Sequence, residues 1–121
     1  MQVEQFVVNV NSGQPEELIA FYRDKVGLTV NPDFGPGAFM AGSSNFVAFM
    51  IEGHDGVKGA TKEPDRVLLN FLVADAAAEQ KRLEGQGVRF VRGAAEEPGF
   101  GIVATFQDPD GNYCQLMELR M

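Results

Sequence analysis

Hydrophobic and polar positions alternate along parts of this chain and follow helical spacing in others. The segment from Val3 to Val10 alternates and is rich in valine, which predicts a β-strand. Residues 12–17 place a proline and two acidic residues where a helix begins, and apolar residues then recur at helical spacing to Val26. Gly27 is a natural stop for this helix. Short strands are predicted next, at residues 28–31, 38–41 and 46–52.

The same order of elements starts again after a glycine-rich and charged connection at residues 53–65. A strand is predicted at residues 67–73, followed by a helix that Asp75 can cap and that ends near Gly85 to Gly87. Further strands are predicted at residues 88–91, 102–107 and 113–119, with a hairpin turn at residues 109–112. The element order is therefore β-α-β-β-β, twice.

Direct sequence similarity supports two copies of one unit. The matching segments are VGLTV (26–30) with QGVRF (86–90), NFVAFM (45–50) with NYCQLM (112–117), and QFVVNV (5–10) with LLNFLV (68–73). Each unit is too small to bury much surface alone. We expect an α+β fold in a single domain, with module 1 at about residues 1–57 and module 2 at about residues 64–121.

Alternation assigns the strand residues to two sheet faces. The helix-facing core is predicted to contain Phe6, Val8, Val10, Val47, Phe49, Ile51, Leu69, Phe71, Val73, Cys114 and Leu116. The opposite face is predicted to carry Gln5, Val7, Asn9, Phe46, Ala48, Met50, Leu68, Asn70, Leu72, Tyr113, Gln115 and Met117. An apolar surface with a few orienting polar groups is typical of a small-molecule site. The alternative is that these amides pair with each other or with buried water.

Aromatic residues beside glycine pairs are candidate lids over that face, or they pack in the core or at its rim. They are Phe34, Phe39 and Phe100. The single histidine, His54, is flanked by glycines and is predicted to lie on a solvated turn.

Composition narrows the possible partners. The chain has 121 residues and a net charge of −7, which disfavours nucleic acid and anionic membranes, keeps the protein soluble, and mildly favours cationic ligands. The single cysteine, Cys114, cannot form an internal disulfide. No apolar stretch is long enough to cross a membrane, and no basic segment precedes an apolar one at the start. These features predict a cytoplasmic protein.

The repeated element order, together with AFYRDKVGL (20–28) and DPDGN (108–112), resembles the vicinal oxygen chelate superfamily along the whole chain. This superfamily includes glyoxalase I, bleomycin-resistance proteins and extradiol dioxygenases. The resemblance implies paired modules that form a cupped mixed sheet with helices on the outer face, commonly completed in a homodimer. In the enzymes a divalent metal is held on the concave face.

The metal positions implied by the resemblance fall on Gln5, Ala48, Leu68 and Gln115. Ala48 and Leu68 carry no donor atom, and the two amides are weak neutral ligands for ions that prefer carboxylate or imidazole. We therefore expect no metal and no cofactor, and a protein that binds a small organic molecule, cationic or aromatic, like the bleomycin-resistance branch. Two alternatives stay open: a metal-dependent lyase, isomerase or dioxygenase, and a dimerising interaction module.

Overall fold

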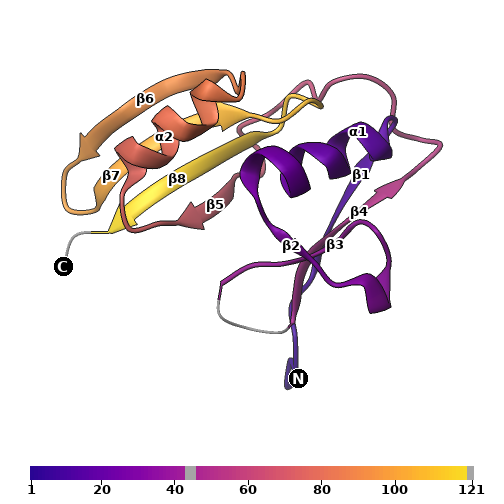
Figure 1. Cartoon of the computed structure of the whole chain (residues 1–121). Coiled ribbons are helices and arrows are strands. Elements are labelled where there is room, and N and C mark those ends of the chain that lie inside the picture. The colour runs from indigo at the N-terminus through magenta and orange to yellow at the C-terminus, as the bar shows by residue number, and fades with distance from the viewer. Residues whose placement is uncertain (43–45, 120–121) are drawn as a thin grey trace. The chain divides into compact units, whose positions relative to one another are not determined.

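The computed structural model describes residues 1–42 and 46–119, and the chain divides into two compact units, unit 1 (residues 1–59) and unit 2 (residues 60–121) (Figure 1). Unit 1 contains β1 (Val8–Ser12), α1 (Pro15–Ala20), the π-helical turn η1 (Phe21–Val26), β2 (Thr29–Val30), the 3₁₀ turn η2 (Pro32–Phe34), β3 (Ala38–Met40) and β4 (Val47–Gly53). Unit 2 contains β5 (Leu69–Leu72), α2 (Ala76–Gly85), β6 (Phe90–Glu97), β7 (Gly101–Gln107) and β8 (Tyr113–Leu119).

Each unit contains one four-stranded mixed sheet, and the two sheets have the same topology. The strand orders are β1-β4-β3-β2 and β5-β8-β7-β6. In each sheet the first strand of the unit is parallel to its last strand, β1 to β4 and β5 to β8, and the other pairs are antiparallel. The predicted α+β fold with two βαβββ modules is confirmed. The strand register confirms the internal repeat. Asn9 pairs with Met50 in unit 1, and the residues that the repeat aligns with them, Leu72 at an offset of 63 and Met117 at an offset of 67, pair with each other in unit 2. Asn45 of the repeated segment lies outside the described residues.

The core of unit 1 is a cluster of aromatic rings. Phe39 and Phe49 stack with centroids 5.3 Å apart, and the Tyr22 ring lies 5.3 Å from Phe49 with its edge toward it. Tyr22 and Phe39 are fully buried. The prediction that Phe39 lies over a ligand face as a lid is therefore wrong, since its alternating position in β3 turns it into this cluster.

The helical segment of unit 1 ends where predicted. Gly27 follows η1 with φ of 87°, a left-handed conformation that suits glycine, and its amide donates to the carbonyl of Tyr22. On the exposed side of η1, a hydrogen bond from Arg23 lowers the pKa of Asp24.

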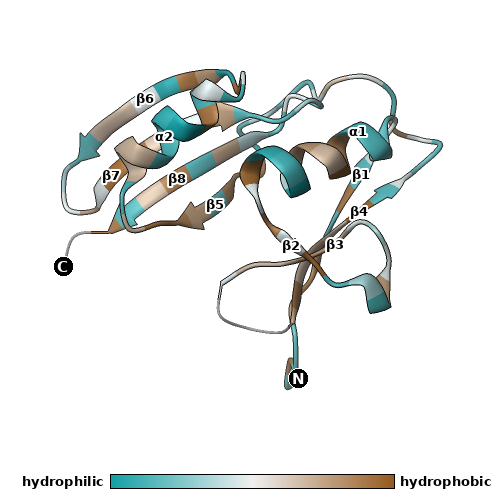
Figure 2. Cartoon of the chain, in the orientation of Figure 1, coloured by the Kyte–Doolittle hydropathy of each residue, from teal (hydrophilic) through white to brown (hydrophobic). Residues whose placement is uncertain are grey.

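The core of unit 2 is mainly aliphatic. Asp75 caps α2 as predicted, with its Oδ1 accepting from the Ala78 amide at 3.0 Å. The fully buried side chains include Leu83, Phe106 and Cys114, so the predicted core position of Cys114 is confirmed. Figure 2 shows β8 as a hydrophobic strand with isolated hydrophilic bands, the pattern of a strand with one face in the core.

Two predicted strands differ from the structure by more than two residues at one end. The first begins at Val8 instead of Val3, and the predicted core residue Phe6 is 79% exposed. The amide Nε2 of Gln5 donates to the carbonyl of Val47 at 2.8 Å. This side-chain hydrogen bond replaces the backbone hydrogen bonds that would extend the pairing of β1 with β4 before Val8. β6 begins at Phe90 and extends to Glu97, beyond the predicted 88–91, because its polar residues suit an edge strand.

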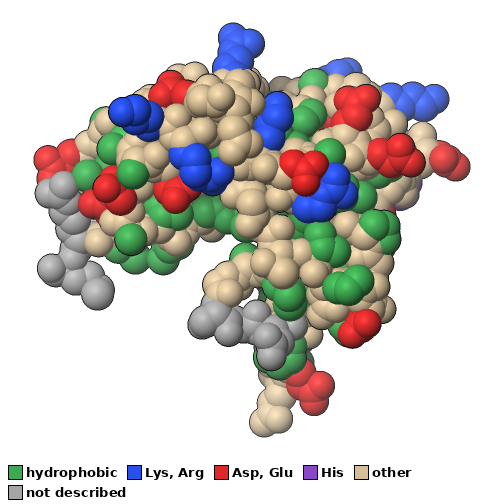
Figure 3. Space-filling view, in the orientation of Figure 1, with side chains coloured by type: hydrophobic (Ala, Val, Ile, Leu, Met, Phe, Trp, Pro, Cys, Tyr) green, Lys and Arg blue, Asp and Glu red, His purple; other side chains and the backbone are tan. Residues whose placement is uncertain are grey.

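Charged side chains of both signs are intermixed on the visible surface of unit 2 (Figure 3). Among the described residues, no helix is both long and apolar enough to cross a membrane.

Candidate functional site

The candidate site residues in the strands, apart from Phe39, lie on the far face of each sheet, by which we mean the surface turned away from the α-helix of that unit. The other surface is core, as shown by buried Val47, Phe49 and Ile51 in β4 and buried Cys114 and Leu116 in β8. α2 lies across this core surface in unit 2 (Figure 1). Because side chains alternate, the intervening residues of the central strands point to the far face.

A small pocket is present beside the far face of unit 1. It has a volume of about 180 Å³ and is lined by Gln5, Val7, Phe34, Phe46, Val47 and Met50. Phe34 and Phe46 are both more than 60% exposed, so two large rings border the pocket without packing into the core. The hydrogen bond from Gln5 to Val47 holds the amide at the wall. The pocket is thus apolar, with one fixed polar group, which suits a small organic ligand.

The far face of unit 2 carries a polar row that crosses all four strands. Asn70 pairs with Gln115, Gln115 with Thr105, and Thr105 with Arg92. Nε2 of Gln115 donates to Oγ1 of Thr105 at 3.4 Å. The next row is apolar and consists of Leu72, Met117, Val103 and Ala95. The two rows together give this face one hydrogen-bonding stripe and one hydrophobic stripe.

A β-bulge places Arg92 in the polar row. Phe90 pairs with Phe106, but Arg92 pairs with Thr105, so β6 has one more residue than β7 over this stretch. Without that extra residue, Arg92 would point to the same face as Phe90, which is the core face. A second shift follows before Ala95, and there Oε1 of Gln80 on α2 accepts from the Ala94 amide at 2.7 Å. This hydrogen bond satisfies the backbone N–H of Ala94, which has no partner in the shifted ladder.

The structure brings together some of the predicted ligand-binding residues. Gln5, Phe46 and Met50 line one pocket. Asn70 and Gln115 are register partners, and Tyr113 and Met117 lie on the same face of β8 as Gln115.

Other predicted residues lie apart from these groups. Asn9 pairs with Met50 in the ladder but does not line the pocket, and Phe100 lies in the turn between β6 and β7. His54 lies on an exposed turn as predicted, with Nδ1 accepting from the Gly56 amide at 2.9 Å.

Sequence reasoning missed Arg92, Thr105 and Gln80. Arg92 falls beyond the predicted end of its strand, and the face of a residue after a bulge cannot be counted by simple alternation. The glycine and acidic residues that surround Arg92 in VRGAAEE are the signal that could have indicated an irregular edge strand.

The residues at the implied metal positions do not fit a divalent ion. Ala48 and Leu68 carry no donor atom, and Gln5, whose Nε2 donates to Val47, offers only a neutral amide oxygen. In the ladder the partner of Gln115 is Asn70 and not Leu68, which adds only a second neutral amide. Within residues 1–42 and 46–119, no three or more His, Cys, Asp or Glu side chains are grouped so that they could hold a metal.

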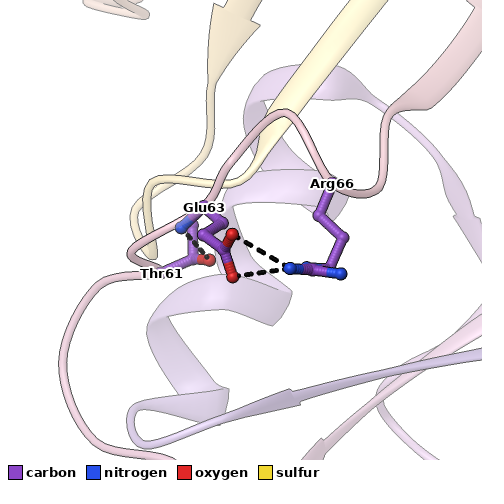
Figure 4. Close-up of polar contacts among 3 residues, drawn as sticks. All are labelled: Thr61, Glu63 and Arg66. Atoms are coloured by element: carbon purple, nitrogen blue, oxygen red, sulfur yellow. Dashed lines mark hydrogen bonds and ion pairs between the residues drawn. The ribbon is translucent and has the colours of Figure 1, made fainter.

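A second cavity, of about 300 Å³, lies at the segment that leads into β5. Its lining mixes polar and apolar side chains and includes Thr61, Glu63, Arg66 and Asn112. Figure 4 shows that Arg66 donates to both carboxylate oxygens of Glu63, while the Glu63 amide donates to Oγ1 of Thr61. Glu63 and Arg66 are exposed and satisfy one another, so this cavity is a weaker candidate than the far faces.

Comparison with known proteins identifies one matching family. The sequence model described as Glyoxalase/Bleomycin resistance protein/Dioxygenase superfamily matches residues 4–116. No curated protein matches the chain significantly.

Three solved structures illustrate the likeness in fold. TnmS3, an antibiotic binding protein from Streptomyces sp. CB03234, has a TM-score of 0.77 at 22% identity, with 99% of each chain covered. A putative glyoxalase family protein from Bacillus anthracis has a TM-score of 0.70 at 23% identity, again with 99% of each chain covered. A glyoxalase/bleomycin resistance protein from Streptomyces sp. CB03234 has a TM-score of 0.67 at 20% identity, covering 93% of this chain and 97% of that one.

Proposed function

Because the chain belongs to the glyoxalase/bleomycin resistance protein/dioxygenase superfamily, we propose that it binds a small organic molecule on its far faces without a resident metal. The observation that carries this proposal is the unit 1 pocket, in which two exposed rings and Met50 surround the fixed amide of Gln5. Exposed rings of this size gain most when they cover a planar apolar ligand. The ligand we expect is therefore aromatic. TnmS3, which shares the fold and is an antibiotic binding protein, supports a small organic ligand.

The metal-free part of the proposal rests on donor chemistry. Neutral amides do not offset the cost of dehydrating a divalent ion. Protein purified without chelators should contain zinc, iron, manganese and nickel well below stoichiometric amounts. A stoichiometric metal that is lost in Gln5→Ala and Gln115→Ala would instead favour a metal-dependent lyase, isomerase or dioxygenase.

Ligand binding can be tested with the neutral aromatic probe N-phenyl-1-naphthylamine, whose fluorescence rises in apolar sites. The chain contains no tryptophan, so the probe signal is read without interference. We expect saturable binding by the wild type, and about tenfold weaker binding by Phe46→Ala, because a ring that borders the pocket is removed.

Phe6→Ala is the matched control for this experiment. Phe6 is 79% exposed but does not line the pocket, so its removal should leave probe affinity unchanged. Equal losses in Phe46→Ala and Phe6→Ala, or no saturable binding by the wild type, would contradict the proposal. The second of these results would favour a dimerising interaction module.

We also propose that units 1 and 2 act as one ligand-binding domain in a cytoplasmic homodimer. The superfamily resemblance supports the dimer, and the single buried cysteine, Cys114, is consistent with a reducing compartment. Sedimentation at micromolar concentration should give the dimer mass, and a monomer mass would contradict this part of the proposal.

A further inference from the structure

We propose that the far face of unit 2 recognises an oxygen-acceptor group of the ligand, a carboxylate or a carbonyl, through Arg92 and Gln115. The inference rests on the proposed function and names the chemistry of the ligand's polar end. It differs from the expectation set by the net charge of −7, which favours a cationic ligand. The groups at the binding face decide which end of a ligand is accepted, and the charge of the whole chain acts mainly on its approach.

Arg92 is the strongest donor in the polar row. Its guanidinium has five N–H groups in a planar fork that matches carboxylate geometry. Nη1 of Arg92 forms an ion pair with Glu97, which lies on the same face of β6 across Ala95. A carboxylate occupies two of those N–H groups at most in a bidentate pair, so donors remain for a ligand. The Arg92 side chain is 48% exposed, which leaves it accessible.

Gln115 supplies the second contact. One of its amide hydrogens is directed to Thr105, and the other hydrogen and the carbonyl oxygen are left for a ligand. Thr105 is only 7% exposed, so it acts as a positioning residue that fixes the orientation of the amide. Arg92 on β6 and Gln115 on β8 therefore flank Thr105 on β7, and the two donors lie on the same stripe of the face.

The adjacent apolar row completes the site. Met117 and Val103 lie one row from Gln115 and Thr105 on the same face, at a spacing of about 7 Å. Val103 and Met117 are only 5% and 8% exposed, so an aromatic ring meets this row at Leu72, which is 64% exposed, while a carboxylate attached to the ring reaches the polar row at Gln115. The bulge and its bond from Gln80 hold Arg92 in this position, since bulges are a recurring means of re-aiming a side chain at a site.

The test compares two naphthalene probes of equal size and opposite charge, 2-naphthoate and 2-naphthylmethylammonium, near neutral pH. The wild type should bind 2-naphthoate about tenfold more tightly, the usual size of a charge-assisted hydrogen-bond contribution. Arg92→Gln should abolish this preference while the affinity for neutral N-phenyl-1-naphthylamine stays unchanged. Arg92→Lys should restore part of the preference, because the charge is kept and the fork is lost.

Two further variants sharpen the result. Gln115→Glu keeps the size of the side chain and places a negative charge in the row, so it should reverse the preference toward the ammonium probe. Arg82→Gln is the matched control, because Arg82 is a similarly exposed, ion-paired arginine on α2, and its removal should change neither affinity. Thermal melts of each variant check that the fold is retained.

The outcomes separate the two proposals. Equal binding of both charged probes by the wild type, tighter binding of the ammonium probe, or equal effects of Arg92→Gln and Arg82→Gln would overturn this inference while the proposed function stands. Failure of the neutral probe to bind the wild type would overturn the proposed function, and this inference with it.

Discussion

Units 1 and 2 have the same strand order and matching register between their parallel strands, but they are built from different side chains. The interior of unit 1 is a cluster of rings around Phe49, whereas aliphatic residues and Cys114 dominate the interior of unit 2. Their far faces differ as well, with an aromatic pocket in unit 1 and a polar row in unit 2. The comparison indicates that alternation and turn positions determine this topology, and that the identity of the core residues is freer.

The two units also differ in regularity. β6 and β7 contain 8 and 7 residues, whereas β2 and β3 contain 2 and 3. α2 is a ten-residue α-helix with a side-chain cap, whereas α1 has six residues, continues into a π-helical turn and has no side-chain cap. Unit 1 therefore has less backbone ladder to stabilise it, and we expect its stability to depend more on ring packing.

The largest expected effect comes from the ring cluster. Phe39→Ala should lower the free energy of unfolding by about 3–5 kcal/mol, because a fully buried ring is removed from contact with Tyr22 and Phe49. Urea denaturation measures the loss. Phe34→Ala is the control five positions earlier. Phe34 is exposed, so its loss should cost less than about 0.5 kcal/mol. Similar losses in the free energy of unfolding for the two variants would contradict the assignment of Phe39 to the core and Phe34 to the exposed rim of unit 1.

A smaller difference should separate two glycines, one from each unit. A Cβ at Gly37 would lie 2.3 Å from the carbonyl oxygen of Ile51, so Gly37→Ala should destabilise unit 1 by about 2–3 kcal/mol. A Cβ at Gly85 on α2 meets nothing within 4 Å, and Gly85→Ala should stabilise unit 2 by up to about 0.5 kcal/mol. Thermal melts of the two variants should therefore shift in opposite directions. Shifts in the same direction would contradict this account.

The smallest difference between paired variants concerns the cap of α2. Asp75→Ala removes the acceptor of the Ala78 amide and should cost about 1 kcal/mol in the free energy of unfolding. Asp75→Asn keeps a capping oxygen and should cost much less. Denaturation of the three proteins in parallel measures both values, and an Asn variant as unstable as the Ala variant would show that the cap contributes little to unit 2.

The sequence predicts the regular elements well. β8 was predicted at its observed bounds, because alternation and the turn at residues 109–112 act together, and the Asp75 cap identifies the start of α2. The start of β1 was missed, since a side-chain bond from Gln5 to Val47 is a tertiary feature without a local signal. Gln115 and Asn70 could be placed on one face by alternation. Arg92 could not, because the bulge reverses the face of every residue that follows it until the next shift.

The bulge in β6 also suggests how relatives with this topology could acquire new ligands. One inserted or deleted residue in an edge strand exchanges the whole set of side chains that the strand presents to the ligand, while the central strands keep their register. Specificity could thus diverge through single-codon insertions and deletions as well as through substitutions. Length variation in this strand would then be a marker of altered ligand preference among such proteins.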